Sequence, residues 1–159
     1  MNRIIVIGSS NTDMVIKAKK LPARGETVLG GTFLMNPGGK GANQAVAAAR
    51  LEGKVTFVTK TGNDLFGEQA IHLFKFEGID TRFIIRDPKN PSGIALITVD
   101  ENGENCIVVA QGSNATLAAY DIEDAAFEAD SHDVFLMQLE IPVSTVEFVA
   151  QKVFNKGIR

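Results

Sequence analysis

Short apolar runs recur along the chain, and helical patterns separate them. Continuous, mostly β-branched runs, which are typical of strands buried on both faces of a parallel sheet, occupy residues 3–7, 55–59, 83–86 and 133–139. Apolar residues at helical spacing follow at residues 41–51, 64–78, 122–127 and 142–157. Because strand, helix and strand in succession form a parallel crossover, the sequence predicts an α/β fold with a mostly parallel sheet and flanking helices.

Two of these helices have ends and buried faces that can be predicted. Asp64 is a typical N-cap and Gly78 a typical end for the second helix, while Pro142 and Gly157 bound the last one. The residues expected on the buried faces are Phe66, Ala70, Leu73 and Phe74 in the second helix, and Val143, Val146, Ala150 and Val153 in the last.

A second group of strands has the pattern of hairpins. Residues 93–99 and 104–109 are apolar runs on either side of Asn102-Gly103, which is a strong hairpin signal. Two further extended pieces lie between Met14 and Met35, around a polar turn at residues 21–27. The sequence therefore predicts a small antiparallel excursion in addition to the parallel sheet.

Composition narrows the class of protein. The chain has 159 residues, of which 45% are hydrophobic, and a net charge of -3 without a basic stripe, so a nucleic-acid partner is not expected. No apolar run approaches the length of a membrane span, and the chain begins as a strand, not as a signal peptide, so we expect a cytoplasmic protein without a membrane partner. Cys106 is a lone cysteine and is expected to be a reduced, buried thiol. With only two histidines, a metal cluster of N and S ligands is not expected.

The strongest polar motif is the glycine-rich stretch at residues 38–44. Glycines allow a ligand to approach the backbone, and the start of the following helix offers unpaired N–H groups. Lys40 and Asn43 add side-chain donors, and Asn43 adds an acceptor. A flexible turn before a core helix is the plain alternative. A nucleotide P-loop is excluded, because Gly41 stands where Ser or Thr is required and Leu34 stands at the leading glycine position.

Three polar side chains follow the ends of two predicted parallel strands. Asn11 and Asp13 come after the strand at residues 3–7, and Glu140 comes after the strand at residues 133–139. The carboxyl ends of parallel strands meet at one edge of the sheet, which is where open α/β sheets bind ligands. The sequence therefore predicts a polar site at this edge, although Asn11 and Asp13 are also residues that shape turns. The segment Gly8-Ser9-Ser10-Asn11 after the first strand does not match a dinucleotide fingerprint, which would need further glycines there.

These motifs closely resemble those of the ribokinase-like, or phosphofructokinase-B type, sugar kinases. The resemblance covers nearly the whole chain and is strongest at residues 8–13, 38–45 and 138–140. It implies that the sugar is bound by Asn11, Asp13, Gly39, Lys40, Asn43 and Glu140, with apolar contacts from Ala95 and Val109. One departure is Glu52, which stands where the family has a glycine, so that Gly53 is expected to end the helix.

The resemblance also implies an activity and an architecture. It predicts ATP-dependent phosphorylation of ribose to ribose 5-phosphate, with magnesium and a monovalent cation as cofactors of the full-length protein. Residues 1–159 would form the N-terminal part of a single domain, with strands of a β lid at about 13–35 and 93–109 through which a homo-oligomer assembles. The family's catalytic base and ATP-binding motifs are not found, so the chain appears truncated within the fold and its parallel sheet is expected to expose an apolar edge.

Two other interpretations stay open. The chain could be a non-catalytic module for sugar binding or dimerisation, which would bind ribose without turnover. It could also represent a kinase of another pentose or of a nucleoside, although Lys40 and Gln44 favour ribose by resemblance.

Overall fold

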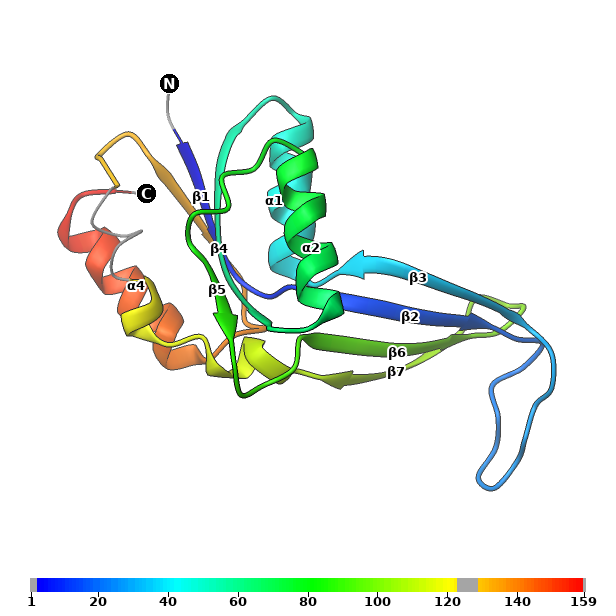
Figure 1. The fold of residues 1–159 in the computed structure, drawn as a ribbon. Helices are drawn as coiled ribbons and strands as arrows, with labels where there is room; N and C mark the ends of the chain where they lie inside the picture. Colours follow the sequence, from blue (N-terminus) through cyan, green and yellow to red (C-terminus); the bar gives the residue numbers. More distant parts are fainter. Residues whose placement is uncertain (1–2, 123–128, 159) are drawn as a thin grey trace.

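The computed structural model describes residues 3–122 and 129–158, which form two sheets (Figure 1). The first sheet is parallel throughout, as its apolar strands predict, with the order β5-β4-β1-β8. Its strands are β1 (Arg3–Ile7), β4 (Lys54–Gly62), β5 (Ile84–Asp87) and β8 (Val134–Met137). The fold class is therefore α/β, as the sequence predicts.

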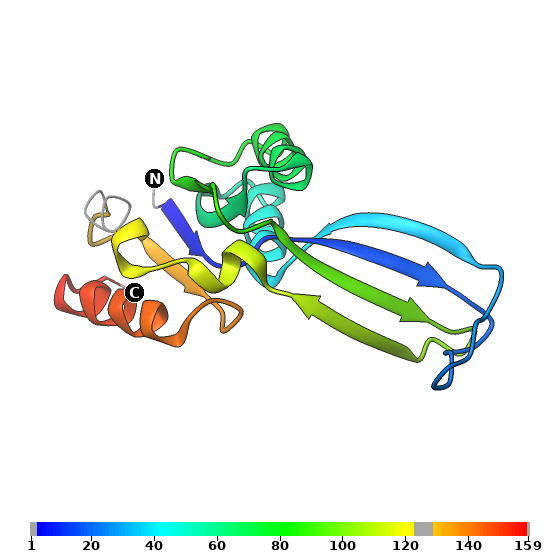
Figure 2. The ribbon, with the colours of Figure 1, turned by 60° about the horizontal axis from the view of Figure 1, so that its bottom comes forward.

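Helices cover both faces of the parallel sheet. Helices α1 (Lys40–Arg50) and α2 (Leu65–Phe76) lie on one side and α4 (Val143–Asn155) on the other (Figures 1 and 2). Successive residues of β1 point to opposite faces, so Val6 belongs to one core cluster while Ile5 and Ile7 belong to the other. The first cluster also contains Phe57 and Phe74, whose rings meet edge to face at 5.0 Å.

The second sheet, which we call the lid sheet, projects away from the helices (Figure 2). Its order is β3-β2-β6-β7. Its strands are β2 (Asn11–Lys17), β3 (Thr32–Gly38), β6 (Gly93–Val99) and β7 (Asn105–Ala110). The predicted hairpin β6–β7 is antiparallel, and so is the pair β2–β3, but the central pair β2–β6 is parallel. The lid sheet is thus mixed and not purely antiparallel.

Helices α1, α2 and α4 end in the same hydrogen-bonded turn, in which one residue has a left-handed backbone. In α2 and α4 that residue is a glycine, Gly78 or Gly157, as expected. In α1 it is Glu52, at φ 65°, while the N–H of Gly53 donates to Ala48 O at 2.9 Å. The expectation that Gly53 takes the helix-ending conformation is therefore wrong, since Glu52 takes it.

Other expectations need correction. The buried residues of α4 are Thr145, Val149 and Val153, whereas Val143 and Ala150 are exposed. Cys106, expected to be buried, is exposed on β7. The predicted helix at residues 122–127 lies outside the described residues beyond its first position.

The predicted start of α2 and the predicted turn between β6 and β7 are found at the expected residues. Asp64 caps α2 by accepting the N–H of Gly67 at 2.9 Å. The hairpin turn at Asn102-Gly103 is part of a longer loop, in which the Asp100 carboxylate accepts the N–H groups of Asn102 and Glu104. A short 3-10 helix, η1 (Gly112–Thr116), then follows β7 and leads the chain back to the parallel sheet.

Candidate functional site

Three connections meet where the two sheets join, and glycines let them pack closely. The turn from β1 to β2 contacts the start of α1 so tightly that a Cβ on Gly41 would lie 2.6 Å from the Ser9 nitrogen. Gly39 has φ 91°, and a Cβ there would lie 2.9 Å from the Asn11 nitrogen. The turn after β8 completes the junction, because the side chain of Gln138 covers Gly8. The glycine-rich stretch therefore serves close backbone packing.

Glu140 ties these connections together. Its Oε2 accepts the Ser9 hydroxyl at 2.7 Å and the Lys40 backbone N–H at 2.9 Å, and its Oε1 pairs with the Lys40 ammonium. Burial raises the pKa of Glu140, but the hydrogen bonds from Lys40 and Ser9 outweigh it and lower the pKa below its ordinary value. Glu140 is thus held as a carboxylate that bridges β8, β1 and α1.

The first N–H groups of α1 are already used by the protein. The N–H of Lys40 donates to Glu140, the N–H of Gly41 donates weakly to Ser9 Oγ at 3.4 Å, and that of Ala42 donates to Ser9 O at 2.9 Å. The expectation that this helix start offers unpaired N–H groups is therefore wrong. What remains for a ligand at this place is the Glu140 carboxylate and the exposed ammonium of Lys40.

Asp13 lies in β2. It is on the same face of the lid sheet as Ala95 and Val109, the two residues that are expected to make apolar contacts with the sugar. It is in register with Ala95 of β6, and Ala95 is in register with Val109 of β7. Its carboxylate rests on Gly38, where a Cβ would lie 2.3 Å from the carboxyl carbon. Burial, followed by the negative charge of Glu140, raises the pKa of Asp13 above its ordinary value.

Asn11 is held by a residue from the 3-10 helix. Asn114, which is only 2% exposed, donates from Nδ2 to Asn11 Oδ1 at 2.7 Å. The same amide accepts the Ser10 N–H at 2.9 Å and donates to Ser10 O at 3.1 Å. Since the side-chain oxygen of Asn11 accepts this hydrogen bond, its side-chain NH₂ group is the part that is left to donate to a ligand.

These residues surround a pocket of about 310 Å³, which we call the front pocket. The residues that line it are Ser9, Asn11, Val109, Gln111, Asn114, Leu139 and Glu140. Three of the predicted site residues, Asn11, Val109 and Glu140, therefore face one cavity.

The other predicted site residues lie around the front pocket or apart from it. Lys40 contacts the front pocket through its ion pair with Glu140, and Gly39 packs against the backbone of Asn11. Asp13 is paired with Ala95 in the neighbouring strand of the lid sheet. Asn43 does not line the front pocket; it lines a separate groove between α1 and α2.

Two residues of the site were missed by the sequence analysis. Ser9 lies within the motif at residues 8–13, but nothing in its residue type distinguishes it from a turn residue. Asn114 lies in a short irregular segment without periodicity, and only its long-range contacts to Ser10 and Asn11 reveal its role. Such contacts leave no local signal in a single sequence.

The front pocket is suited to an uncharged, hydroxyl-rich molecule. The carboxylate of Glu140 accepts hydrogen bonds, the Asn11 amide donates, and Val109 and Leu139 offer apolar contact. Across residues 3–122 and 129–158, no group of three or more His, Cys, Asp or Glu side chains could hold a metal ion. The described residues thus offer no metal site that is built from protein side chains alone.

No helix within the described ranges is both long and apolar enough to cross a membrane.

Comparison with known proteins gives a consistent family match. A family model described as pfkB family carbohydrate kinase matches residues 1–158. A ribokinase from Haemophilus influenzae is 40% identical over 156 residues, which are 98% of this chain and 51% of that protein. A deoxyribokinase from Salmonella typhi is 39% identical over 143 residues, covering 90% of this chain and 47% of that protein. The chain thus spans about half the length of these curated relatives.

The fold is also found in a solved structure with bound ligands. The Arabidopsis thaliana ribokinase complexed with ribose and ATP matches with a TM-score of 0.82 and 28% identity, covering 99% of this chain and 52% of that one.

Proposed function

Because this chain belongs to the pfkB family of carbohydrate kinases, we propose that it carries the site for the acceptor sugar of a ribose kinase. The reaction proposed for the whole protein is transfer of the γ-phosphate of ATP to a hydroxyl group of ribose. ATP, magnesium and a monovalent cation are proposed as its cofactors by resemblance. Their sites are not assigned to the described residues, which are proposed to bind and orient the sugar.

The observation that carries this proposal is the front pocket, in which Asn11 and Glu140 face the same cavity. A carboxylate that accepts and an amide that donates can hold neighbouring hydroxyl groups of one sugar. Lys40, fixed by Glu140, supplies a further donor beside them. The H. influenzae and A. thaliana relatives named ribokinase support ribose as the sugar.

The remaining predicted residues are given roles in the same proposal. Asp13 would accept hydroxyl groups from the lid side, with Ala95 and Val109 packing against the apolar face of the sugar. Gly39 would let the sugar approach the start of α1, and Asn43 would reach it from the first turn of that helix. Asn43 has the weakest support, because it lines a different groove.

A second candidate substrate is 2-deoxyribose. The S. typhi relative is a deoxyribokinase, and its identity to this chain is almost the same as that of the H. influenzae ribokinase. The two sugars differ by one hydroxyl group, and a site built to hydrogen-bond that group rejects the molecule that lacks it.

Calorimetric titration of the 159-residue chain with ribose, and separately with 2-deoxyribose, tests the proposal. We expect saturable binding of ribose and weaker binding of 2-deoxyribose. Tighter binding of 2-deoxyribose would favour the second candidate, and no binding of either sugar would contradict a sugar site in this chain. ATP and magnesium are added afterwards in the same cell. Heat of turnover at that step would show that a nucleotide site lies within the chain.

A matched pair of variants links the binding to the site. Asp13→Ala should weaken ribose binding at least about tenfold, because a hydrogen bond to a charged group contributes about 1.5–3 kcal/mol. Glu101→Ala removes an exposed carboxylate from the tip of the β6–β7 loop and should leave ribose binding unchanged. Equal effects of the two variants would contradict the assignment of Asp13.

A homo-oligomer assembled through the lid sheet is the second part of this proposal. The face of the sheet that points away from Asp13 carries Ile16, Phe33, Leu96 and Val108, which are between 46% and 68% exposed. Contiguous exposed apolar residues of this kind typically mark an interaction surface, and we propose a second copy of the chain as its partner.

Sedimentation velocity tests the assembly. We expect a species larger than the monomer for the unmodified chain and a monomer for the double variant Phe33→Lys and Leu96→Lys. A monomer of the unmodified chain at high concentration would contradict assembly through the lid sheet.

A further inference from the structure

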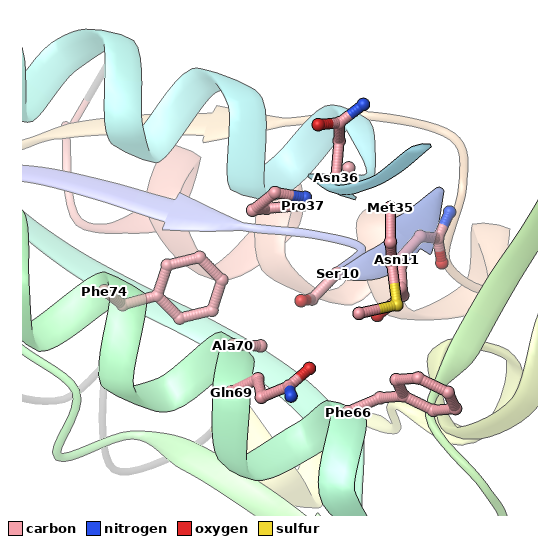
Figure 3. A pocket seen from close by; sticks show the side chains of 11 residues that line it. Ser10, Asn11, Met35, Asn36, Pro37, Phe66, Gln69, Ala70 and Phe74 are labelled. Atoms are coloured by element: carbon pink, nitrogen blue, oxygen red, sulfur yellow. The ribbon is translucent and has the colours of Figure 1, made fainter. Parts of the chain in front are cut away.

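A second cavity, which we call the rear pocket, lies on the opposite side of β2 from the front pocket. It has a volume of about 240 Å³ and is framed by the base of the lid sheet and by α2 (Figure 3). Its apolar wall consists of Met35, Phe66, Ala70 and Phe74, and its polar wall includes Ser10, Thr12 and Gln69. None of the roles proposed above for the site residues makes use of this cavity.

The Ser10 hydroxyl is the feature that points to a ligand. Ser10 is 4% exposed, and Figure 3 shows its oxygen directed toward the space between Ala70 and Phe74. Within the described part of the chain, this oxygen makes no hydrogen bond to another residue, although the Ser10 backbone N–H and C=O are both bound by Asn114. The hydroxyl is open to the cavity, so it is available to a ligand both as a donor and as an acceptor.

Two further polar side chains line the cavity, one from the buried Thr12 and one from Gln69, which is an exposed residue. The hydroxyl of Thr12, which is 9% exposed, and the side-chain amide of Gln69 make no hydrogen bond to any other described residue. Together with Ser10 they offer both donors and acceptors. Opposite them lies Phe74, which is only 1% exposed and presents an apolar surface. The cavity is therefore polar on one side and apolar on the other.

Charge and size define the class of ligand. Every described residue that lines the rear pocket is uncharged, so neither an anionic nor a cationic ligand would find a counter-charge. An engineered apolar cavity of about 150 Å³ holds a benzene molecule, so the rear pocket has room for one ring with a small substituent.

We propose that the rear pocket binds a small uncharged ring compound that carries an amide or hydroxyl group. The ring packs between Phe74 and Met35, and its polar group exchanges hydrogen bonds with Ser10 and Gln69. Asn11 lines both pockets, but the rear pocket is otherwise lined by different residues, such as Ser10 and Phe74 (Figure 3). The proposal does not depend on the identity of the sugar.

Nicotinamide and nicotinate are a matched pair of probes, since they share a ring and differ in charge at neutral pH. Amide NMR spectra of the 159-residue chain are recorded during titration with each. We expect saturable shifts at Ser10, Phe66 and Ala70 with nicotinamide and at least a fivefold weaker response with nicotinate. No saturable shift at these residues, or an equal response to both probes, would overturn the proposal. So would shifts centred on Asn114 and Leu139 that ribose abolishes, because they would place the probe in the front pocket.

Variants locate the binding within the rear pocket. Ala70→Phe should fill the cavity and abolish binding, whereas Ala150→Phe, which adds the same side chain to an exposed position of α4, should not change it. Ser10→Ala should weaken nicotinamide binding severalfold. Thermal unfolding of each variant is measured first. If Ala70→Phe does not fold, Gln69→Leu replaces it, and undiminished binding in both Ser10→Ala and Gln69→Leu would overturn the proposal.

Discussion

Glu140 holds Lys40 at two points, since its Oε2 accepts the backbone N–H of Lys40 at 2.9 Å and its Oε1 pairs with the Lys40 ammonium. We expect Glu140→Ala to lower the free energy of unfolding by about 2 kcal/mol, because the Lys40 N–H and the Ser9 hydroxyl both lose a charged acceptor. Glu140→Gln keeps one oxygen acceptor and should lose about half as much. Urea denaturation measures both, and equal stability of all three proteins would contradict a bridging role.

Asp13 is expected to oppose folding while serving binding. Its pKa is raised in the folded chain, so the stability linked to its protonated form is complete below the pKa of the unfolded chain and is lost as the pH rises through the folded pKa. Asp13→Asn should therefore be more stable than the unmodified chain at pH 7, and the difference should disappear below about pH 4. Ribose binding should fall by at least about tenfold. Lower stability of Asp13→Asn at pH 7 would contradict this prediction.

Asn114 is expected to affect ribose binding indirectly, because it holds the side chain of Asn11. Its amide fixes Ser10 on both sides of the residue and occupies the Asn11 oxygen, so Asn114→Ala leaves three polar atoms without their partner. We expect a loss of about 2–3 kcal/mol in unfolding free energy. We also expect weaker ribose binding under conditions where the variant is fully folded. Asn43→Ala, measured beside it, tests the least supported sugar contact without affecting these bonds.

Asp87 is predicted to make the free energy of unfolding fall as the pH is lowered into the acid range. Its buried carboxylate accepts hydrogen bonds from the Asn90 side chain, the N–H groups of Lys89 and Asn90, and the Thr116 hydroxyl, which together hold its pKa well below the ordinary value. A lowered folded pKa gives stability that is present above the unfolded pKa, about 3.9, and is lost as the pH falls below it. The free energy of unfolding of Asp87→Asn should be about 2 kcal/mol lower than that of the unmodified chain at pH 7. It should also fall less than that of the unmodified chain as the pH is lowered. Parallel pH profiles of the two proteins in urea denaturation would contradict this.

Glu52 is expected to destabilise the end of α1. It adopts φ 65°, a conformation that costs a residue with a side chain about 1 kcal/mol compared with glycine. Glu52→Gly should therefore raise the free energy of unfolding by about 1 kcal/mol, while Glu52→Ala should change it little because alanine bears the same strain. Gly53→Ala should destabilise, since a Cβ there would lie 2.8 Å from Ala48 O.

Local patterns predicted much of the fold. The strand at residues 93–99 has the same bounds in the structure as in the prediction, and Asp64 caps α2 as expected. What failed depends on distant contacts. The parallel pairing of β2 with β6 joins strands far apart in the chain, and Thr145 is buried in α4 because its hydroxyl donates to Leu117 O at 2.7 Å. A helical pattern cannot show that a threonine has found such a partner.

The candidate site was predictable where strand ends fixed it. Asn11 and Glu140 follow β1 and β8, which flank each other in the sheet, so their meeting follows from topology. The N–H groups at the start of α1 were expected to be unpaired, but Ser9 and Glu140 occupy them. Only the folded backbone reveals such internal competition for donors.

The lid sheet leaves the parallel sheet through very short connections, Gly8–Ser10 between β1 and β2 and Gly39 between β3 and α1. A rotation of the lid sheet as a unit would therefore pivot at these connections, next to the front pocket. A strand of seven residues is about 23 Å long, so a rotation of about 10° at Ser9 carries the tip of β2 through about 4 Å but displaces Asn11 by only about 1 Å. Large movements of the free end of the lid sheet would therefore leave Asn11, at its base, almost in place.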